Sequence, residues 1–243
     1  MVRLLSYPLT IIYFFFFGLT LVVFHPIQWV ALNLFGYRAH KASVSLLNWF
    51  LMRCTNLIGT RYRFDNAYNI PTDRPLIIVT NHQSMYDIPP IIWYMRKHHP
   101  KFVSKKELGK GIPSVSFNLR HGGSALIDRK DPNQALHAIA ELGRYIETHH
   151  RSAVIFPEGT RSRDGRPKTF KPSGLKALIK NAPSALIVPI TINNSWKLLR
   201  FGQFPMGLGS YLKFKVQEPI PIEGDIETLV KKVEQAVIKD LVY

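Results

Sequence analysis

Leu76-Ile-Ile-Val79 is a short apolar run, and the polar loop Thr80-Asn-His-Gln-Ser-Met-Tyr-Asp87 follows it directly. An uninterrupted apolar run of this length, bounded by polar residues, predicts a strand buried on both faces. Further along the chain, similar short runs alternate with helix-length segments. This alternation predicts an α/β fold with a mostly parallel central sheet flanked by helices. The other expected strands are 101–104, 126–127, 153–156, 186–192 and 211–216, and the expected helices are 89–98, 132–148, 174–180 and 226–237.

Composition favours a globular protein with an anionic partner. The 243 residues are 46% hydrophobic, which is enough for a packed core. Lys and Arg number 32 against 16 Asp and Glu, for a net charge of +16. Such an excess predicts binding to nucleic acid, an acidic membrane surface or an acidic substrate. The single cysteine, Cys54, lies in an apolar stretch, so we interpret it as a buried, unreactive thiol.

The amino-terminal segment is apolar enough to enter a membrane. Between Arg3 and Arg38 there is no charged residue, and the apolar runs are 4–24 and 27–35. The first run has the roughly 20 residues that a bilayer core requires. A secretory signal is disfavoured because the apolar run is too long and no small-residue cleavage site follows it. Four consecutive phenylalanines without a polar face also disfavour a buried helix of a soluble protein.

His25-Pro26 is expected to break the helix between these two apolar runs. Cations flank both outer ends, so a hairpin dipping into one leaflet would keep both ends cytoplasmic. A single span remains the alternative. Residues 43–58 are expected to form an amphipathic helix. We therefore expect membrane-anchoring helices over 1–60 and an α/β catalytic domain over 61–243, on the cytoplasmic side of the membrane.

His82 and Asp87, in the loop after the first expected strand, are candidates for a base and its orienting acid. A neutral imidazole can accept a proton, and a carboxylate on its other nitrogen fixes the tautomer. Asp87 also precedes Ile88-Pro-Pro90, so a role as a helix N-cap is the structural alternative. No Gly-x-Ser-x-Gly elbow is present. The pattern therefore favours a histidine that deprotonates an incoming hydroxyl over a covalent hydrolase.

A second polar loop, Phe156-Pro-Glu-Gly-Thr-Arg-Ser162, follows the expected strand 153–156. From Arg161 to Lys180 the chain carries seven cations and one acid. Of these, Lys176 and Lys180 are interpreted as part of a solvated basic face. Arg161 differs because it lies in a tight glycine-containing loop, where its guanidinium can hold a phosphate with two hydrogen bonds. Lys105 and Arg129 each follow another expected strand, and alone either could be a surface residue.

Together these segments resemble the glycerolipid acyltransferases, specifically the 1-acylglycerol-3-phosphate acyltransferases. That family has four ordered sequence blocks. Asn81, His82 and Asp87 match the first block, Asn-His-x-x-x-x-Asp, and residues 123–129 match the second, which ends in Ile-Asp-Arg. Residues 156–162 match Phe-Pro-Glu-Gly-Thr-Arg-Ser without change, and Val188-Pro-Ile190 matches the Val-Pro-x block. The likeness spans residues 76–192.

The resemblance implies a role for each matching residue. His82 would be the general base and Asp87 its partner, while Lys105, Arg129 and Arg161 would hold the phosphate of the acceptor. Pro189 would lie near the acyl chain. The residues implied to shape the acceptor site are Glu158, Gly159 and Thr160.

The implied reaction transfers a fatty acyl group to the sn-2 hydroxyl of 1-acylglycerol-3-phosphate and forms phosphatidic acid, a step of phospholipid biosynthesis. The donor would be acyl-CoA or acyl-carrier protein, without cofactor or metal. No Cys/His cluster has metal-ligand spacing, and His98-His99 and His149-His150 look solvated. The expected partners are the lipid bilayer, lysophosphatidic acid and the acyl donor.

Two alternatives remain. The first keeps the chemistry and changes the acceptor, to a hydroxyacyl amino acid lipid or another lysolipid. The second is a basic membrane or nucleic-acid binding protein without enzymatic activity. We expect no nucleic acid partner, because the sequence has no helix-turn-helix or aromatic RNA-binding signature and the second alternative leaves His82 and Asp87 unexplained.

Overall fold

The computed structural model describes residues 2–243 and contains one mixed sheet with helices on both faces. Within these residues eight strands form the sheet, in the order β1-β7-β6-β2-β5-β3-β4, and β8 pairs with β6. All neighbouring strands are parallel except that β7 and β8 run antiparallel to β6. The strands are β1 (Arg61–Asp65), β2 (Leu76–Thr80), β3 (Pro100–Lys105), β4 (Ala125–Ile127), β5 (Ser152–Ile155), β6 (Leu186–Asn193), β7 (Tyr211–Val216) and β8 (Ile220–Pro221).

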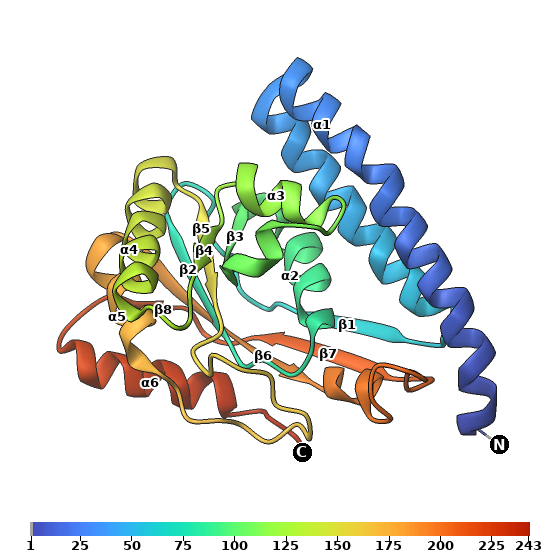
Figure 1. Cartoon of the computed structure of the whole chain (residues 1–243). Helices are drawn as coiled ribbons and strands as arrows, with labels where there is room; N and C mark the ends of the chain where they lie inside the picture. The colour runs from blue at the N-terminus through green and yellow to red at the C-terminus, as the bar shows by residue number, and fades with distance from the viewer. Residues whose placement is uncertain (1) are drawn as a thin grey trace.

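Two helical layers cover the sheet (Figure 1). The helices are α1 (Val2–Asn56), α2 (Ile88–Tyr94), α3 (Val115–His121), α4 (Pro132–His149), α5 (Pro172–Asn181) and α6 (Ile226–Ile238). α4, α5 and α6 pack on one face through a core that includes Leu142, Leu175 and Val233. The other face packs against α2 and α1 through a second core that includes Ile91 and Tyr13. Because β2 is buried on both faces, its five residues are all apolar or small.

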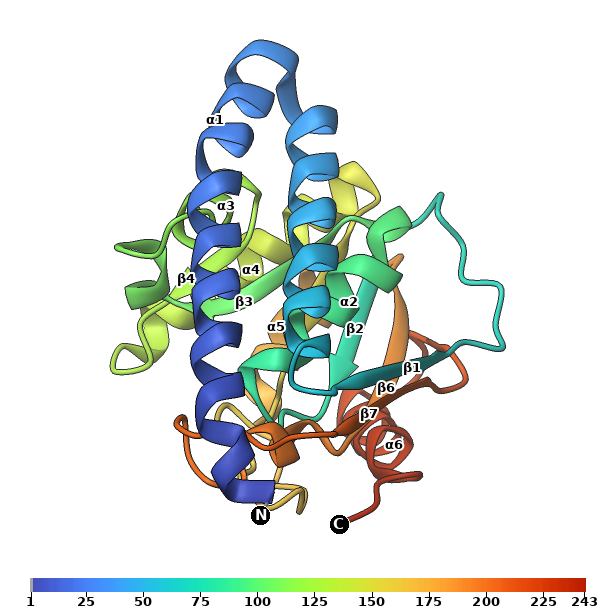
Figure 2. The ribbon, with the colours of Figure 1, turned by 90° about the vertical axis from the view of Figure 1, so that its right-hand side faces the viewer.

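The first helix, α1, is folded back on itself as a hairpin (Figure 2). The reversal occurs at Gly36, whose φ of 76° and ψ of −167° lie outside the helical region. Glycine adopts this positive φ without the steric cost that a side chain would bring. The arms pack on each other through contacts that include Phe24 with Phe50, with ring centroids 5.6 Å apart. The expected helical hairpin is thus confirmed as part of the fold.

The position of the turn was predicted incorrectly. Pro26 lies inside the first arm, and the helix continues through it to Gly36. A proline removes one backbone hydrogen bond but can be accommodated in a long helix whose other side is held by packing. Leu21 and Phe24, just before the proline, supply that packing against Leu47 and Leu51 of the second arm. The expected amphipathic helix at 43–58 corresponds to the C-terminal part of the second arm, which ends at Asn56.

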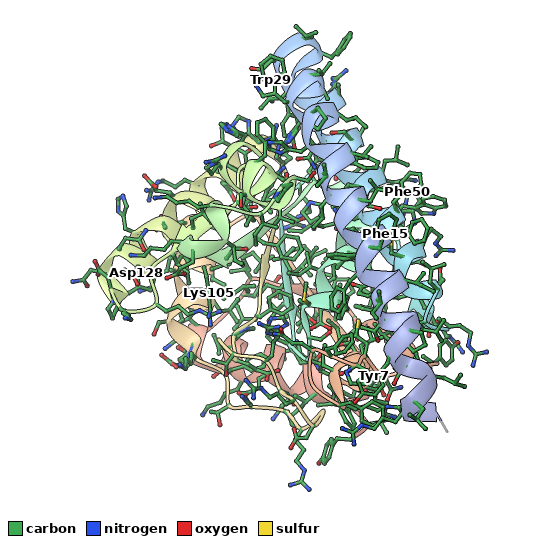
Figure 3. The ribbon with its side chains drawn as sticks, turned by 45° about the vertical axis from the view of Figure 1, so that its right-hand side comes forward. Tyr7, Phe15, Trp29, Phe50, Lys105 and Asp128 are labelled. Atoms are coloured by element: carbon green, nitrogen blue, oxygen red, sulfur yellow. The ribbon has the colours of Figure 1, made fainter. Side chains whose placement is uncertain are left out.

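Much of the hairpin surface remains apolar and exposed. Phe15 is 64% exposed and Trp29 53% exposed. Figure 3 shows Phe15 and Phe50 along the hairpin and Trp29 near its tip, whereas Lys105 and Asp128 lie well away from it. By length and composition α1 is able to cross a bilayer. A contiguous apolar surface of this kind is typical of a site of contact with lipid or with another protein.

Three elements were not expected from the sequence: β1, β8 and α3. β1 reads Arg-Tyr-Arg-Phe-Asp and pairs only with β7, at the edge of the sheet. An edge strand is solvated on one side, so it lacks the apolar run that identifies a buried strand. β8 is only two residues long, Ile220–Pro221. These elements extend the sheet without changing the predicted fold class.

Candidate active site

His82 lies in the loop just after β2, and two contacts fix the orientation of its ring. Its Nδ1 is 2.7 Å from Oδ2 of Asp87. The ring also stacks on Phe156, which follows β5, with centroids 4.1 Å apart and an interplanar angle of 28°. Among the described residues Nε2 has no hydrogen-bond partner, so this nitrogen is free to accept a proton from a bound molecule.

Asp87 is fully buried, and its carboxylate accepts hydrogen bonds from several groups. The backbone N–H groups of Gln83 and Ser84 donate to Oδ2 at 2.8 and 2.9 Å. Ser195 donates its hydroxyl proton to Oδ1. These donors compensate the buried negative charge, which would otherwise be costly. Asp87 makes no side-chain cap bond to α2, so its carboxylate is directed at His82 instead of at the helix terminus.

The loops after β2 and β5 are joined by hydrogen bonds through His82. Its backbone N–H donates to Oε1 of Glu158 at 3.0 Å, and its carbonyl accepts from the N–H of Ser162 at 2.7 Å. On the other side, Asn81 is fixed to β6: its Nδ2 donates to the Ile192 carbonyl at 2.8 Å and its Oδ1 accepts from the Ile192 N–H at 2.7 Å. His82 is therefore held between the loop after β5 on one side and, through Asn81, strand β6 on the other.

Glu158 is buried, with 3% of its surface exposed, beside the catalytic candidates. Burial raises its pKa to about 7, and the hydrogen bond from the His82 backbone opposes this rise only partly. Its Oε2 has no partner among the described residues. A carboxyl group that is protonated near neutrality can donate a hydrogen bond, so Glu158 is suited to hold a polar group of the acceptor.

The raised pKa of Glu158 predicts a pH dependence of stability. Between about pH 4.5 and about 7 the folded protein retains a proton that the unfolded chain has released, so stability falls as the pH rises through this window. Glu158→Gln should remove this loss, which is at most about 3.5 kcal/mol, because the window spans about 2.5 pKa units and one unit corresponds to about 1.4 kcal/mol. Thermal unfolding in detergent at several pH values measures it. Parallel pH curves for both proteins would contradict the assignment.

The three candidate phosphate-binding cations lie, like His82, near the carboxyl ends of the parallel strands. β2, β5, β3 and β4 are adjacent and parallel. Arg161 follows β5, Lys105 is the last residue of β3, and Arg129 follows β4. Neighbouring strands are about 4.8 Å apart, so β5, which precedes Arg161, is one strand spacing from β2. β4, which precedes Arg129, is three strand spacings from β2, or about 14 Å. Burial and then the positive charge of Arg161 lower the pKa of Arg129, so the two guanidinium groups are close enough to repel each other.

The remaining predicted residues fall into two groups. Gly159 has φ +69° and its N–H donates to the Phe156 carbonyl at 3.0 Å, which closes the tight turn after β5. Thr160 is exposed at the end of this turn, and Lys168 donates to its hydroxyl at 3.1 Å. Pro189, in contrast, lies inside β6 opposite Val79, well before the carboxyl end of the strand. Its position relative to an acyl chain stays a prediction.

Sequence reasoning missed Ser195 and Gln83 as part of the site. The Ser195 N–H donates to Oε1 of Gln83 at 3.0 Å, and its hydroxyl contacts both Asp87 and Ser84. Ser195 follows the expected strand 186–192, whose carboxyl end adjoins that of β2, but this position alone does not indicate that its hydroxyl reaches Asp87. Asp128 of the second sequence block has a structural contact instead: its carboxylate pairs with Lys106 at 2.5 Å, away from the hairpin (Figure 3).

This arrangement combines a histidine whose Nε2 is free, a buried orienting carboxylate and three cations near the carboxyl ends of adjacent parallel strands. In open α/β sheets, ligands bind beyond the carboxyl ends of the strands, where these groups lie. No group of three potential metal ligands occurs within residues 2–243. The site can deprotonate an alcohol and hold an anionic group of the same molecule.

Comparisons with known proteins agree on one family. Residues 61–193 match the acyltransferase family model. The chain is 24% identical over 202 residues to the 1-acyl-sn-glycerol-3-phosphate acyltransferase alpha of Ovis aries, covering 81% of this chain and 68% of that protein. It is 35% identical over 127 residues to the 1-acyl-sn-glycerol-3-phosphate acyltransferase of Helicobacter pylori, covering 49% of this chain and 51% of that protein.

Among solved structures, the 1-acyl-sn-glycerophosphate acyltransferase PlsC from Thermotoga maritima has a similar fold. The TM-score is 0.78 at 24% identity, and the match covers 98% of this chain and 95% of that one. The likeness therefore extends beyond the sheet to the helical hairpin. The chain belongs to the acyltransferase family, as its sequence blocks predicted.

Proposed function

We propose that this protein transfers a fatty acyl group from acyl-CoA or acyl-carrier protein to the sn-2 hydroxyl of 1-acylglycerol-3-phosphate. The product is phosphatidic acid, an intermediate of phospholipid biosynthesis. The observation that carries the proposal is the free Nε2 of His82 at the same sheet edge as Arg161. The relatives from Ovis aries and Helicobacter pylori, both named as 1-acyl-sn-glycerol-3-phosphate acyltransferases, support the same assignment.

In the proposed reaction, His82 Nε2 takes the proton of the acceptor hydroxyl while the hydroxyl oxygen bonds to the thioester carbonyl carbon. The tetrahedral intermediate then expels the thiolate, the carbon–sulfur bond breaks, and the imidazolium returns its proton to the sulfur. Asp87 stabilises the imidazolium between these steps. Because a thioester is already activated, proximity and one base supply most of the required rate acceleration.

Phosphate binding orients the acceptor in this proposal. The sn-2 hydroxyl and the phosphate of the acceptor are on adjacent glycerol carbons, so a cation near His82 is needed to hold the phosphate while His82 contacts the hydroxyl. Arg161 meets this requirement best because it comes from the strand next to β2, while Arg129 and Lys105 complete the positive site. Glu158, when protonated, would donate a hydrogen bond from its unpaired Oε2 to a glycerol or phosphate oxygen.

The hairpin supports a membrane location. Its exposed apolar side chains would contact the hydrocarbon region, which holds the acceptor's acyl chain and receives the product. We assign residues 1–60 to membrane attachment and residues 61–243 to catalysis, with the catalytic part on the cytoplasmic side. The positive charge of the chain suits the anionic lipids of that leaflet.

The proposal is tested by supplying purified protein with two acceptors and two donors. The acceptors are 1-acylglycerol-3-phosphate and a hydroxyacyl amino acid lipid, and the donors are acyl-CoA and acyl-carrier protein. We expect phosphatidic acid to form from the first acceptor, and chromatography of the lipid products detects it. Acylation of the amino acid lipid alone would establish the alternative acceptor instead.

The role of Arg161 gives a separate prediction. Arg161→Ala should raise KM for 1-acylglycerol-3-phosphate by roughly 10- to 100-fold, since a charge-assisted hydrogen bond contributes about 1.5–3 kcal/mol. KM for the acyl donor should change little. Arg144→Ala is a matched control, because Arg144 lies on α4 and donates to Asn181. An equal effect of both variants, or a loss confined to the donor, would remove Arg161 from the phosphate site.

A further inference from the structure

A second group of cations surrounds Tyr37, near the tip of the hairpin. The Cζ of Arg151 lies 3.8 Å from the centroid of the Tyr37 ring, and Nζ of Lys101 lies 4.8 Å from it. The ring also stacks on His99, and its hydroxyl is 2.8 Å from His99 Nδ1. The expectation that His98-His99 is solvated is therefore wrong: both residues are half-buried, and His99 packs against Tyr37.

Beside Tyr37 the surface forms two adjoining hollows that share Lys41, Ser45 and His99. The outer one is a groove of ≈ 550 Å³ between the second hairpin arm and the segment after α2. The inner one reaches Lys101 and His40. The groove is lined by four cations and by no acidic residue; these cations are Arg38, Lys41, Arg96 and Lys97.

None of these charges is neutralised inside the molecule. The ion pairs among the described residues involve neither the four groove cations nor Lys101 and Arg151. Lys101 is only 6% exposed, and its pKa is lowered to about 7 by burial and then by the charges of Arg151 and Lys41. A buried charge without a counter-charge is costly. An anion in the hollow would supply that counter-charge.

One further group points to a missing ligand. His40 lines the inner hollow with 1% of its surface exposed, and its Nε2 has no hydrogen-bond partner among the described residues. Ser124 and Asn118 line the same hollow. Buried polar atoms are normally paired, so the unpaired nitrogen of His40 indicates a missing partner. The inner hollow has a volume of ≈ 20 Å³, which admits one water-sized oxygen, so a phosphate group would have to lie in the outer groove.

This cluster is separate from the candidate active site. Lys101 and Arg151 lie at the amino ends of β3 and β5, whereas the site residues follow the carboxyl ends of the same strands. The groove adjoins the hairpin, whose tip carries exposed Leu34 and Phe35. Figure 2 shows this tip at the end of the hairpin that is far from the N-terminus.

We propose that this cluster is a second lipid site, which binds the phosphate headgroup of an anionic phospholipid in the groove through Arg38, Lys41 and Lys97, with the positive charge of Lys101 behind them in the inner hollow. The lipid's acyl chains would lie along the exposed apolar side of the hairpin. That continuity with an apolar surface favours a lipid over free phosphate. Basic pockets beside membrane helices are a common means of holding acidic headgroups. This site goes beyond the proposed acyl transfer, because its residues take no part in the chemistry.

The test measures binding of the full-length protein to phosphatidylcholine vesicles with and without phosphatidylglycerol, which is not an acceptor in the proposed reaction. Lys41→Gln with Lys97→Gln should weaken binding to the anionic vesicles by roughly tenfold or more, since each cation near the surface contributes about 1 kcal/mol. Binding to neutral vesicles should be unchanged. Acyl transfer in detergent should also be unchanged, which shows that the variant is folded.

The matched control is Lys231→Gln with Lys232→Gln, which removes the same charge from exposed positions on α6. This variant should bind anionic vesicles as the unaltered protein does. An equal loss in both variants would reduce the effect to net charge and overturn the proposal. Inorganic phosphate that competes fully with the vesicles at equal concentration would identify an ion site and overturn the lipid assignment.

Discussion

Replacing His82 with alanine should lower kcat by about three orders of magnitude while leaving acceptor binding nearly intact. General-base catalysis contributes on the order of 10²–10⁴ to the rate, and here one imidazole serves both proton transfers. The cavity left beside Phe156 is small and lies at the surface of a loop, so the fold should be retained. Release of the free thiol from acyl-CoA, followed together with phosphatidic acid formation, measures the loss.

Two variants make this result specific. His137→Ala is the matched control, because His137 is an exposed histidine on α4 that pairs only with Glu141. It should retain full activity. Asp87→Asn should approach the loss seen for His82→Ala, since an amide cannot stabilise the imidazolium in the same way. If His82→Ala kept most of its activity in purified form, another group would be the base and the proposed mechanism would be wrong.

The second large effect is expected at Asn81 and concerns stability. Asn81 is 1% exposed and satisfies both the N–H and the carbonyl of Ile192. Alanine would leave these two buried backbone groups unpaired, at a cost of roughly 2–4 kcal/mol. Denaturant or thermal unfolding in detergent should show this decrease. Activity per folded molecule should also fall, because Asn81 immediately precedes His82.

An exposed asparagine provides the comparison. Asn66 lies in the exposed segment just after β1 and accepts one hydrogen bond, from the N–H of Tyr68 at 3.0 Å. Asn66→Ala should therefore change the free energy of unfolding by less than about 1 kcal/mol. Equal destabilisation by the two substitutions would mean that the contact between β2 and β6 does not depend on the Asn81 amide.

Local patterns were sufficient to predict the buried strands and the site loops. Leu76–Val79 and Leu186–Ile192 are apolar on both sides because helices cover both faces of the sheet, so their composition alone identifies them. The loops after them are polar because they lie beyond the core. The pairing of His82 with Asp87 was predictable for a similar reason, since the two residues are close in sequence and share one loop.

Features that depend on contacts between distant segments could not be predicted. Ser195 is 108 positions from Asp87, and no local pattern indicates that its hydroxyl reaches that carboxylate. The turn at Gly36 was missed because Pro26 appeared to be the stronger helix breaker. The cluster around Tyr37 combines residues from α1, β3 and the start of β5, each of which looks like a surface cation in isolation.

The hairpin shares the central core with the sheet, and this has a consequence for any attempt to obtain a water-soluble fragment. Tyr13 and Ile58 are fully buried in that core, and the Tyr13 hydroxyl contacts the hydroxyl of Tyr86, one residue before Asp87. A fragment that begins at residue 61 would lack the helices that cover one face of the sheet, and Ile78 and Ile91 would become exposed to solvent. The hairpin thus contributes buried side chains to the core on one face of the sheet. Removing it would destabilise the folded domain as well as detach it from the membrane.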